Sequence, residues 1–181
     1  MRVGGVIIAG GQSRRMGADK LTLLLEGKRI IDHVIDRVAP QVDALVINAN
    51  EAVDRFAGHR VIPDLRATGT PLAGVHAGLS WGAAKGFTHV LTTSGDTPFL
   101  PADLRTRLSL HNAAIAESHG QQHYLIGLWP VAALPLLTEN LFRVQDWAAK
   151  LGATPVHWDG DPFFNINTPE DLIEAARKSA I

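Results

Sequence analysis

Short apolar runs rich in β-branched residues alternate with segments of helical periodicity along most of the chain. The apolar runs predict strands at residues 3–8, 45–47, 60–62, 89–93, 113–117 and 125–129. Helices are predicted at residues 30–38, 52–57, 71–84, 102–110, 131–137, 144–151 and from 169 onward. Such an alternation is typical of βαβ units around a mostly parallel sheet. The sequence therefore predicts an α/β fold, a single three-layer, Rossmann-like, doubly wound domain over residues 1–181.

The composition excludes several classes of protein. Among the 181 residues, 46% are apolar, and 17 basic side chains nearly balance 18 acidic ones, so no excess positive charge indicates nucleic-acid binding. The absence of cysteine excludes disulfides, metal–thiolate sites and thiol catalysis. No apolar stretch reaches the ~18–20 residues that cross a bilayer. We expect a cytoplasmic protein that binds neither nucleic acid nor a membrane.

The loop after the first predicted strand is the strongest functional feature of the sequence. In a parallel sheet, this loop lies at the carboxyl ends of the strands, where ligands bind. The adjacent Gly10 and Gly11 let backbone N–H groups turn toward an anion, and Arg14, Arg15 and Lys20 add positive charge. The loop matches neither the Gly-Lys-Ser/Thr ending of a P-loop nor the G-x-G-x-x-G dinucleotide fingerprint. It therefore predicts a polyphosphate site of another kind.

Polar residues also follow other predicted strands. Asp96 follows the strand at 89–93, so its carboxylate either binds Mg²⁺ beside the loop or caps the turn before Pro98. Mg²⁺ needs only one or two carboxylates when phosphate oxygens and waters complete its shell. Asn48 suits a turn as well as it suits a nucleotide contact, and the residues alone leave both interpretations open, whereas from the residues alone Asp64 is a turn residue.

Several segments resemble one known family. The run from Ile8 to Lys20, I-A-G-G-x-S-x-R-M-G-x-D-K, closely resembles the signature of the molybdenum cofactor guanylyltransferases, nucleotidyltransferases with the nucleotide-diphospho-sugar transferase fold. Residues 48–50, 69–74 and 163–172 resemble further segments of this family. The paired glycines are more similar to the GTP-using branch than to the cytidylyltransferases. Tyr124 stands where the family has a proline after its histidine, so the role of His123 is left open.

The resemblance implies an enzyme that transfers GMP from GTP to the phosphate of molybdopterin or the molybdenum cofactor and releases pyrophosphate. It implies catalytic roles for Lys20, Arg15 and Asp96, with Mg²⁺ held by Asp96. The N-terminal half would bind GTP and the metal ion, and the C-terminal half the pterin. The binding residues implied are Ile8, Ala9, Gly10, Gly11, Lys20, Asn48, Asp64, Gly74, Asp96, Asn165 and Asn167. Transient contacts with cofactor-biosynthesis proteins or recipient molybdoenzymes are also expected.

Two alternatives stay open at this point. A nucleotidyltransferase that uses CTP and molybdopterin, or a sugar phosphate, would have the same loop and the same aspartate. A non-catalytic nucleotide-binding domain is the second alternative, because a fold does not by itself define an activity. A preference for GTP over other nucleotides would separate the guanylyltransferase from the first alternative. Loss of turnover when Lys20 or Asp96 is substituted would separate it from the second.

Overall fold

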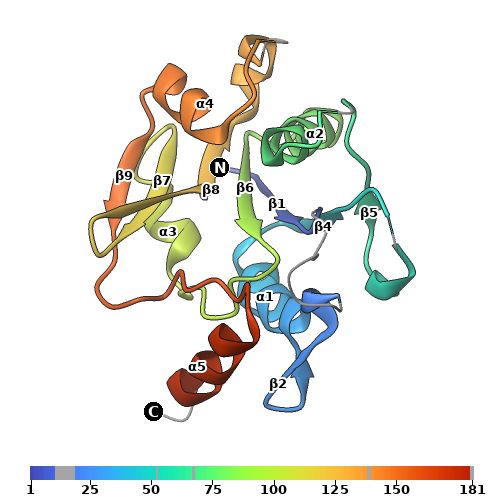
Figure 1. The fold of residues 1–181 in the computed structure, drawn as a ribbon. Helices are drawn as coiled ribbons and strands as arrows, with labels where there is room; N and C mark the ends of the chain where they lie inside the picture. The colour runs from blue at the N-terminus through green and yellow to red at the C-terminus, as the bar shows by residue number, and fades with distance from the viewer. Residues whose placement is uncertain (11–18, 52, 67, 138–139, 180–181) are drawn as a thin grey trace.

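The computed structural model describes residues 1–10, 19–51, 53–66, 68–137 and 140–179, with a seven-stranded sheet at its centre (Figure 1). The strands are β1 (Val3–Ile8), β4 (Ala44–Asn48), β5 (Val61–Ile62), β6 (His89–Ser94), β7 (Ala114–Ser118), β8 (Gln121–Pro130) and β9 (Thr154–His157). Their order across the sheet is β5-β4-β1-β6-β8-β7-β9. Strand β8 runs antiparallel to its neighbours β6 and β7, and all other neighbouring pairs are parallel. The predicted mostly parallel α/β sheet is confirmed.

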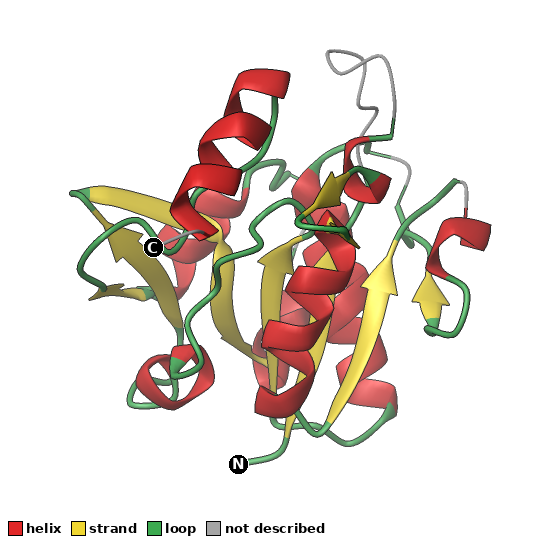
Figure 2. Ribbon diagram, turned by 90° about the horizontal axis from the view of Figure 1, so that it is seen from below, coloured by secondary structure: helices red, strands yellow, loops and turns green. Residues whose placement is uncertain are grey.

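Helices cover both faces of this sheet. The α-helices are α1 (Ile30–Val38), α2 (Pro71–Ala84), α3 (Leu104–Leu108), α4 (Val144–Leu151) and α5 (Pro169–Ser179). The 3₁₀ helices are η1 (Lys20–Thr22), η2 (Ala39–Gln41), η3 (Val53–Phe56) and η4 (Val131–Leu136). Helices α2 and α4 lie on one face and α1 and α3 on the other (Figure 1). Figure 2, turned to the side of α1, shows the strands running behind that layer of helices.

The core explains why β1 is apolar throughout. Val3 and Ile7 belong to the apolar cluster that contains Val34 of α1, and Val6 and Ile8 belong to the cluster on the α2 side. A strand covered by helices on both faces has no solvent-facing side, so its sequence is a continuous apolar run. Each fully buried aliphatic side chain contributes about 1.5–3 kcal/mol. These two clusters fix β1, and hence Ala9 directly after it, at the centre of the sheet.

The structure differs from the sequence prediction at several elements. Strand β9 was not predicted, because it has only four residues and includes Pro155, which a sheet tolerates at its edge. A hairpin of β2 (Leu24–Leu25) and β3 (Lys28–Arg29) was also missed, although Glu26 and Gly27 have the positive φ of a tight hairpin turn. Residues 131–136 form a 3₁₀ helix rather than an α-helix, in keeping with Pro135 inside it. Strand β8 is longer, and α3 shorter, than predicted.

The last helix begins where its sequence predicts. The Thr168 Oγ1 accepts the N–H of Asp171 at 3.2 Å, and an oxygen of the Asp171 carboxylate accepts the N–H of Thr168 at 2.9 Å. These reciprocal bonds satisfy N–H groups that a helix start leaves without partners. None of the helices in the described part of the chain has the length and hydrophobicity of a membrane span.

Candidate active site

Three neighbouring strands end together at the carboxyl edge of the sheet. Ile8, the last residue of β1, lies in register with Asn48 of β4 on one side and Ser94 of β6 on the other. The Ala9 N–H donates to the Asn48 carbonyl at 2.9 Å, and the Gly95 N–H donates to the Ile8 carbonyl at 3.0 Å. Residues just after these three strands are therefore held side by side, as expected for a ligand site in a parallel sheet.

Lys20 and Asp96 form an ion pair at this edge. Lys20 is the first residue of η1, and its Nζ donates to Asp96 Oδ2 and, at 2.8 Å, to the side-chain oxygen of Asn167. The hydroxyl of Ser94 donates to the other carboxylate oxygen of Asp96. Asp96 is buried, so its charge is offset by these donors rather than by water. The structure thus brings together a cation and a carboxylate that are 76 residues apart.

The segment around Ile166 completes this side of the site. The Ile166 N–H donates to the Asp96 carbonyl at 3.0 Å, and its side chain is fully buried. Asn165 and Asn167, on either side of it, are exposed, and Asn165 accepts the Thr97 hydroxyl at 2.6 Å. Both asparagines therefore lie beside Asp96, since Asn165 is bonded to Thr97 and Asn167 to Lys20. The contact of Asn167 with Lys20 was not foreseen from the sequence.

A second polar cluster lies at the end of β4. The Asn48 Nδ2 donates to one Asp64 carboxylate oxygen at 2.9 Å, and the Asn50 Nδ2 donates to the other at 2.7 Å. The Asp64 N–H returns a bond to the Asn50 side-chain oxygen at 2.8 Å. Two amides thus orient the Asp64 carboxylate while leaving it lone pairs for another donor.

Gly74 of α2 packs directly against this cluster. A Cβ at position 74 would lie 2.4 Å from Asn48 Oδ1 and 3.2 Å from Ile8 Cγ2. Real side chains do not approach so closely, so only glycine lets α2 reach the end of β4 without moving Asn48. Gly74, Asn48 and Ile8 are therefore neighbours, as a shared binding surface requires.

The remaining sequence-predicted residues are less constrained. Ala9 is buried, whereas Gly10 is exposed, and no atom of the described residues lies within 4 Å of a Cβ built at Gly10. Gly11 and Arg15 lie outside the described residues. The ring of His123 packs on Phe163 at 4.9 Å between centroids, and its Nε2 lies 2.9 Å from Ser118 Oγ.

The electrostatics of His123 follow from this packing. Burial lowers the pKa of His123, an effect that the nearby Asp161 carboxylate partly opposes. A lowered pKa favours the neutral imidazole, and its packing on the Phe163 ring fits a packing role for His123.

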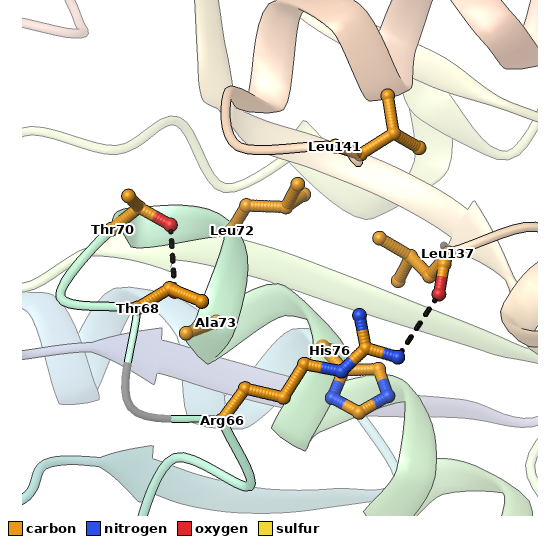
Figure 3. Close-up of a pocket in the computed structure, with 8 residues that line it drawn as sticks. All are labelled: Arg66, Thr68, Thr70, Leu72, Ala73, His76, Leu137 and Leu141. Carbon is orange, nitrogen blue, oxygen red and sulfur yellow. Dashed lines mark hydrogen bonds between the residues drawn. The ribbon is translucent and has the colours of Figure 1, made fainter. Parts of the chain in front are cut away.

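Sequence reasoning missed Arg55, the last-but-one residue of η3, which contacts both Asp19 and the Ala9 carbonyl. A lone arginine in a short helical segment carries no signal of such long-range contacts. A further cavity of ≈ 250 Å³ beside α2 was not foreseen either (Figure 3). Its walls include Arg66, His76 and Leu137, and none of the predicted site residues lines it.

The fold is α/β, and comparisons with known proteins show that the chain is a nucleotidyltransferase and give its family. A model described as the MobA-like NTP transferase domain matches residues 5–153. A protein from Rhodobacter capsulatus named "Molybdenum cofactor guanylyltransferase" is 43% identical over 182 residues, which cover 97% of this chain and 95% of the relative. The chain therefore belongs to the MobA-like family of molybdenum cofactor guanylyltransferases.

Solved structures show the same fold at low sequence identity. Molybdopterin-guanine dinucleotide biosynthesis protein A from Archaeoglobus fulgidus superposes with a TM-score of 0.74 at 20% identity, covering 98% of both chains. Rv0371C from Mycobacterium tuberculosis, solved in complex with manganese, gives a TM-score of 0.71 at 16% identity, covering 98% of this chain and 99% of the other.

Proposed function

We propose that the chain transfers GMP from GTP to the phosphate of molybdopterin or of the molybdenum cofactor. The observation that carries this proposal is the Lys20–Asp96 pair at the carboxyl ends of adjacent strands. Transfer from a triphosphate requires positive charge near the leaving pyrophosphate, and Lys20 supplies it. Family membership supports the choice of GTP and a pterin phosphate as the two substrates.

The residues around Asp96 fit a magnesium ion. The carboxylate oxygens of Asp96 are hard ligands of the kind that Mg²⁺ prefers. Among the described residues, no three His, Asp or Glu side chains gather as a metal site, so phosphate oxygens and waters would complete the shell. The manganese in a structural neighbour is consistent with a divalent ion in this fold. When bound, the ion would offset negative charge on the phosphate oxygens.

The chain's own residues mainly align the reactants. The pterin phosphate is already an anion, so its oxygen attacks the α-phosphorus of GTP without a strong general base. A new P–O bond forms to the α-phosphorus as the bond to the β-phosphate bridging oxygen breaks, and pyrophosphate leaves with that electron pair. Lys20, together with Arg15 and the N–H groups of Gly10 and Gly11, supports the leaving group. Rate enhancement then depends on alignment and charge neutralisation.

In the proposal, each of the two polar clusters binds a different substrate. In the proposal, Ile8, Ala9, Asn48, Asp64 and Gly74 hold the nucleoside, and the oriented Asp64 carboxylate accepts N–H or O–H donors from it. Asn165 and Asn167 hold the pterin side, next to Lys20. The N-terminal half of a single domain thus binds GTP and Mg²⁺, and the C-terminal half binds the pterin. The contact between Lys20 and Asn167 supports this proposal, because it joins the residue proposed to face the pyrophosphate to a residue proposed to hold the pterin.

Pyrophosphate release from GTP, with and without molybdopterin and with CTP, ATP and UTP in parallel, tests this function. We expect release only with GTP, Mg²⁺ and molybdopterin together, and its loss in Lys20→Ala and Asp96→Asn. Lys28→Ala is a matched control, because Lys28 pairs with Asp36 on the exposed side of α1. Faster turnover of CTP or of a sugar phosphate would indicate the first alternative. Nucleotide binding without any turnover would indicate the second.

The cellular setting follows from the proposed substrates. We place the reaction in the cytoplasm, where GTP is available. The dinucleotide product must pass to enzymes that use it, so we expect transient contacts with cofactor-biosynthesis proteins or recipient molybdoenzymes.

A further inference from the structure

Arg55 joins the two ends of the glycine-rich loop. Its Nη1 donates to Asp19 Oδ2 at 2.5 Å, and its Nη2 donates to the Ala9 carbonyl at 3.2 Å. Ala9 directly follows β1, and Asp19 directly precedes Lys20, so these two residues flank residues 10–18. One guanidinium therefore sets the distance between the residue where the loop begins and the residue where it ends.

Arg55 is itself held in place by its surroundings. Its guanidinium lies 4.6 Å above the ring of Phe56, which is buried. The Arg29 Nη1 donates to the Arg55 carbonyl at 2.7 Å, and Arg29 is fixed in turn by a two-bond pair with Asp32. The Arg55 side chain is only 17% exposed. An arginine ordered before the substrate arrives loses little further entropy when it acts, which suits a fixed support.

Asp19 links this support to Lys20. One oxygen of the Asp19 carboxylate, Oδ1, accepts the Leu21 N–H at 3.3 Å as the N-cap of η1, and the other is bound by Arg55. Lys20 is the first residue of η1, so the direction of its side chain depends on how Asp19 is held. The chain of contacts runs from Arg55 through Asp19 to Lys20 and ends at Asp96.

We propose that Arg55 is a positioning residue for the transfer reaction: it holds both ends of the loop so that Lys20 faces the leaving pyrophosphate. The inference depends on the proposed transferase function. Without Arg55, the loop and η1 lose a common anchor, and Lys20 is no longer fixed relative to the α-phosphorus. Misplacement of about 1 Å costs up to about 100-fold in rate. We therefore expect Arg55→Ala to lower kcat by about 10- to 100-fold and to change KM for GTP by less than about threefold.

Asp19→Asn separates the Arg55 contact from the helix cap. Asparagine is as good an N-cap as aspartate, so the bond to the Leu21 N–H is retained, but the charge that faces Arg55 is lost. If Arg55 acts through Asp19, the double variant Arg55→Ala/Asp19→Asn has nearly the same kcat as the worse single variant. Losses that multiply in the double variant would overturn this route of action.

Arg143→Ala is the matched control. Arg143 forms a two-bond pair with Asp146 at the start of α4, with each bond 2.9 Å long. Its removal deletes a similar arginine–aspartate pair, and kcat should stay within about twofold of wild type. Melting temperatures of all variants separate a kinetic loss from unfolding. If Arg55→Ala does not fold, Asp19→Asn and Arg55→Lys carry the test, because both must then lower kcat while they remain folded.

The outcomes distinguish the two proposals. Absence of pyrophosphate release by the wild-type chain with GTP and molybdopterin refutes the proposed function itself. Normal wild-type turnover combined with an unchanged kcat in folded Arg55→Ala refutes only the role of Arg55. A rise in KM without a fall in kcat would also overturn it, because it would show that Arg55 serves nucleotide binding instead of alignment.

Discussion

Gly74→Ala tests whether α2 and Asn48 form one nucleotide-binding surface. The added Cβ would lie 2.4 Å from Asn48 Oδ1 and 3.1 Å from Asn48 Cγ, so the whole amide must move. Asn48 is only 2% exposed, and its Nδ2 is bonded to Asp64 and to the Ile62 carbonyl, so it has no free space to enter. Movement therefore breaks its bond to the Asp64 carboxylate.

The size of the effect follows from the proposed nucleoside contact of Asp64, which is lost when Asn48 no longer orients the carboxylate. A hydrogen bond to a charged group contributes about 1.5–3 kcal/mol. At about 1.4 kcal/mol for each factor of ten, KM for GTP should rise about 10- to 100-fold. Alanine is also the better helix former by about 1 kcal/mol, which offsets part of the strain and keeps α2 intact. We expect a folded protein with weak GTP binding.

Gly78→Ala is the control for this prediction. A Cβ at Gly78 would lie 2.8 Å from Val6 Cγ2, so the variant is overpacked against the same strand, one turn further along the same helix. Both variants should lose about 1–3 kcal/mol of stability from overpacking. Only Gly74→Ala should raise KM, measured by pyrophosphate release, and weaken GTP binding, measured by calorimetry. Equal KM values for the two variants would refute the reasoning.

Three further predictions concern stability. Burial lowers the pKa of His123, so the unfolded chain binds more protons than the folded chain once the pH falls below the ordinary histidine value of about 6.5. The folded state therefore loses stability as the pH falls below this value. His123→Gln should flatten the fall in melting temperature between about pH 7.5 and pH 5. The Val3 N–H bond, at 2.6 Å, holds the pKa of Asp43 below its usual range, so its stabilisation is present at neutral pH and lost in acid. Asp43→Asn should therefore melt lower at pH 7, and its difference from wild type should shrink as pH falls below the ordinary carboxyl value of about 3.9. Thr168→Ala removes the α5 cap and should lower the free energy of unfolding by about 1 kcal/mol, which is a fall of about 2–4 °C in melting temperature. An unchanged melting temperature would contradict the capping role.

Local patterns in the sequence predict much of this fold. Helix α1 was predicted from apolar residues at helical spacing, and Ile31, Val34 and Val38 are all buried as that spacing requires. Helix α5 was predicted from residue 169 onward, and it begins at Pro169, directly after the cap made by Thr168. Each of these signals is contained within a few residues, so tertiary contacts are not needed to detect it.

Contacts across the chain could not be predicted in the same way. The bond from Lys20 to Asn167 spans 147 positions, and it depends on the sheet order and on the path of the final segment. Arg55 and Ala9, which are bonded to each other, are 46 positions apart in the sequence. The resemblance to the family indicated residues of the site such as Lys20, Asp96 and Asn167, but it did not indicate which of these side chains bond to one another. Short edge strands such as β9 are equally hidden, because their pairing partner supplies most of their stability.

The backbone bond from Ile166 to Asp96 has a consequence for how the protein is made. A ribosome finishes the loop, β1 and β6 long before it reaches Asn165 and Asn167, so the nascent chain holds an incomplete centre until its final segment emerges. Nonsense mutations that remove this segment should leave the central strands able to form, yet deprive Lys20 of one of its two partners. A chain that ends before Asn165 therefore lacks part of the candidate active site, even where its central strands form.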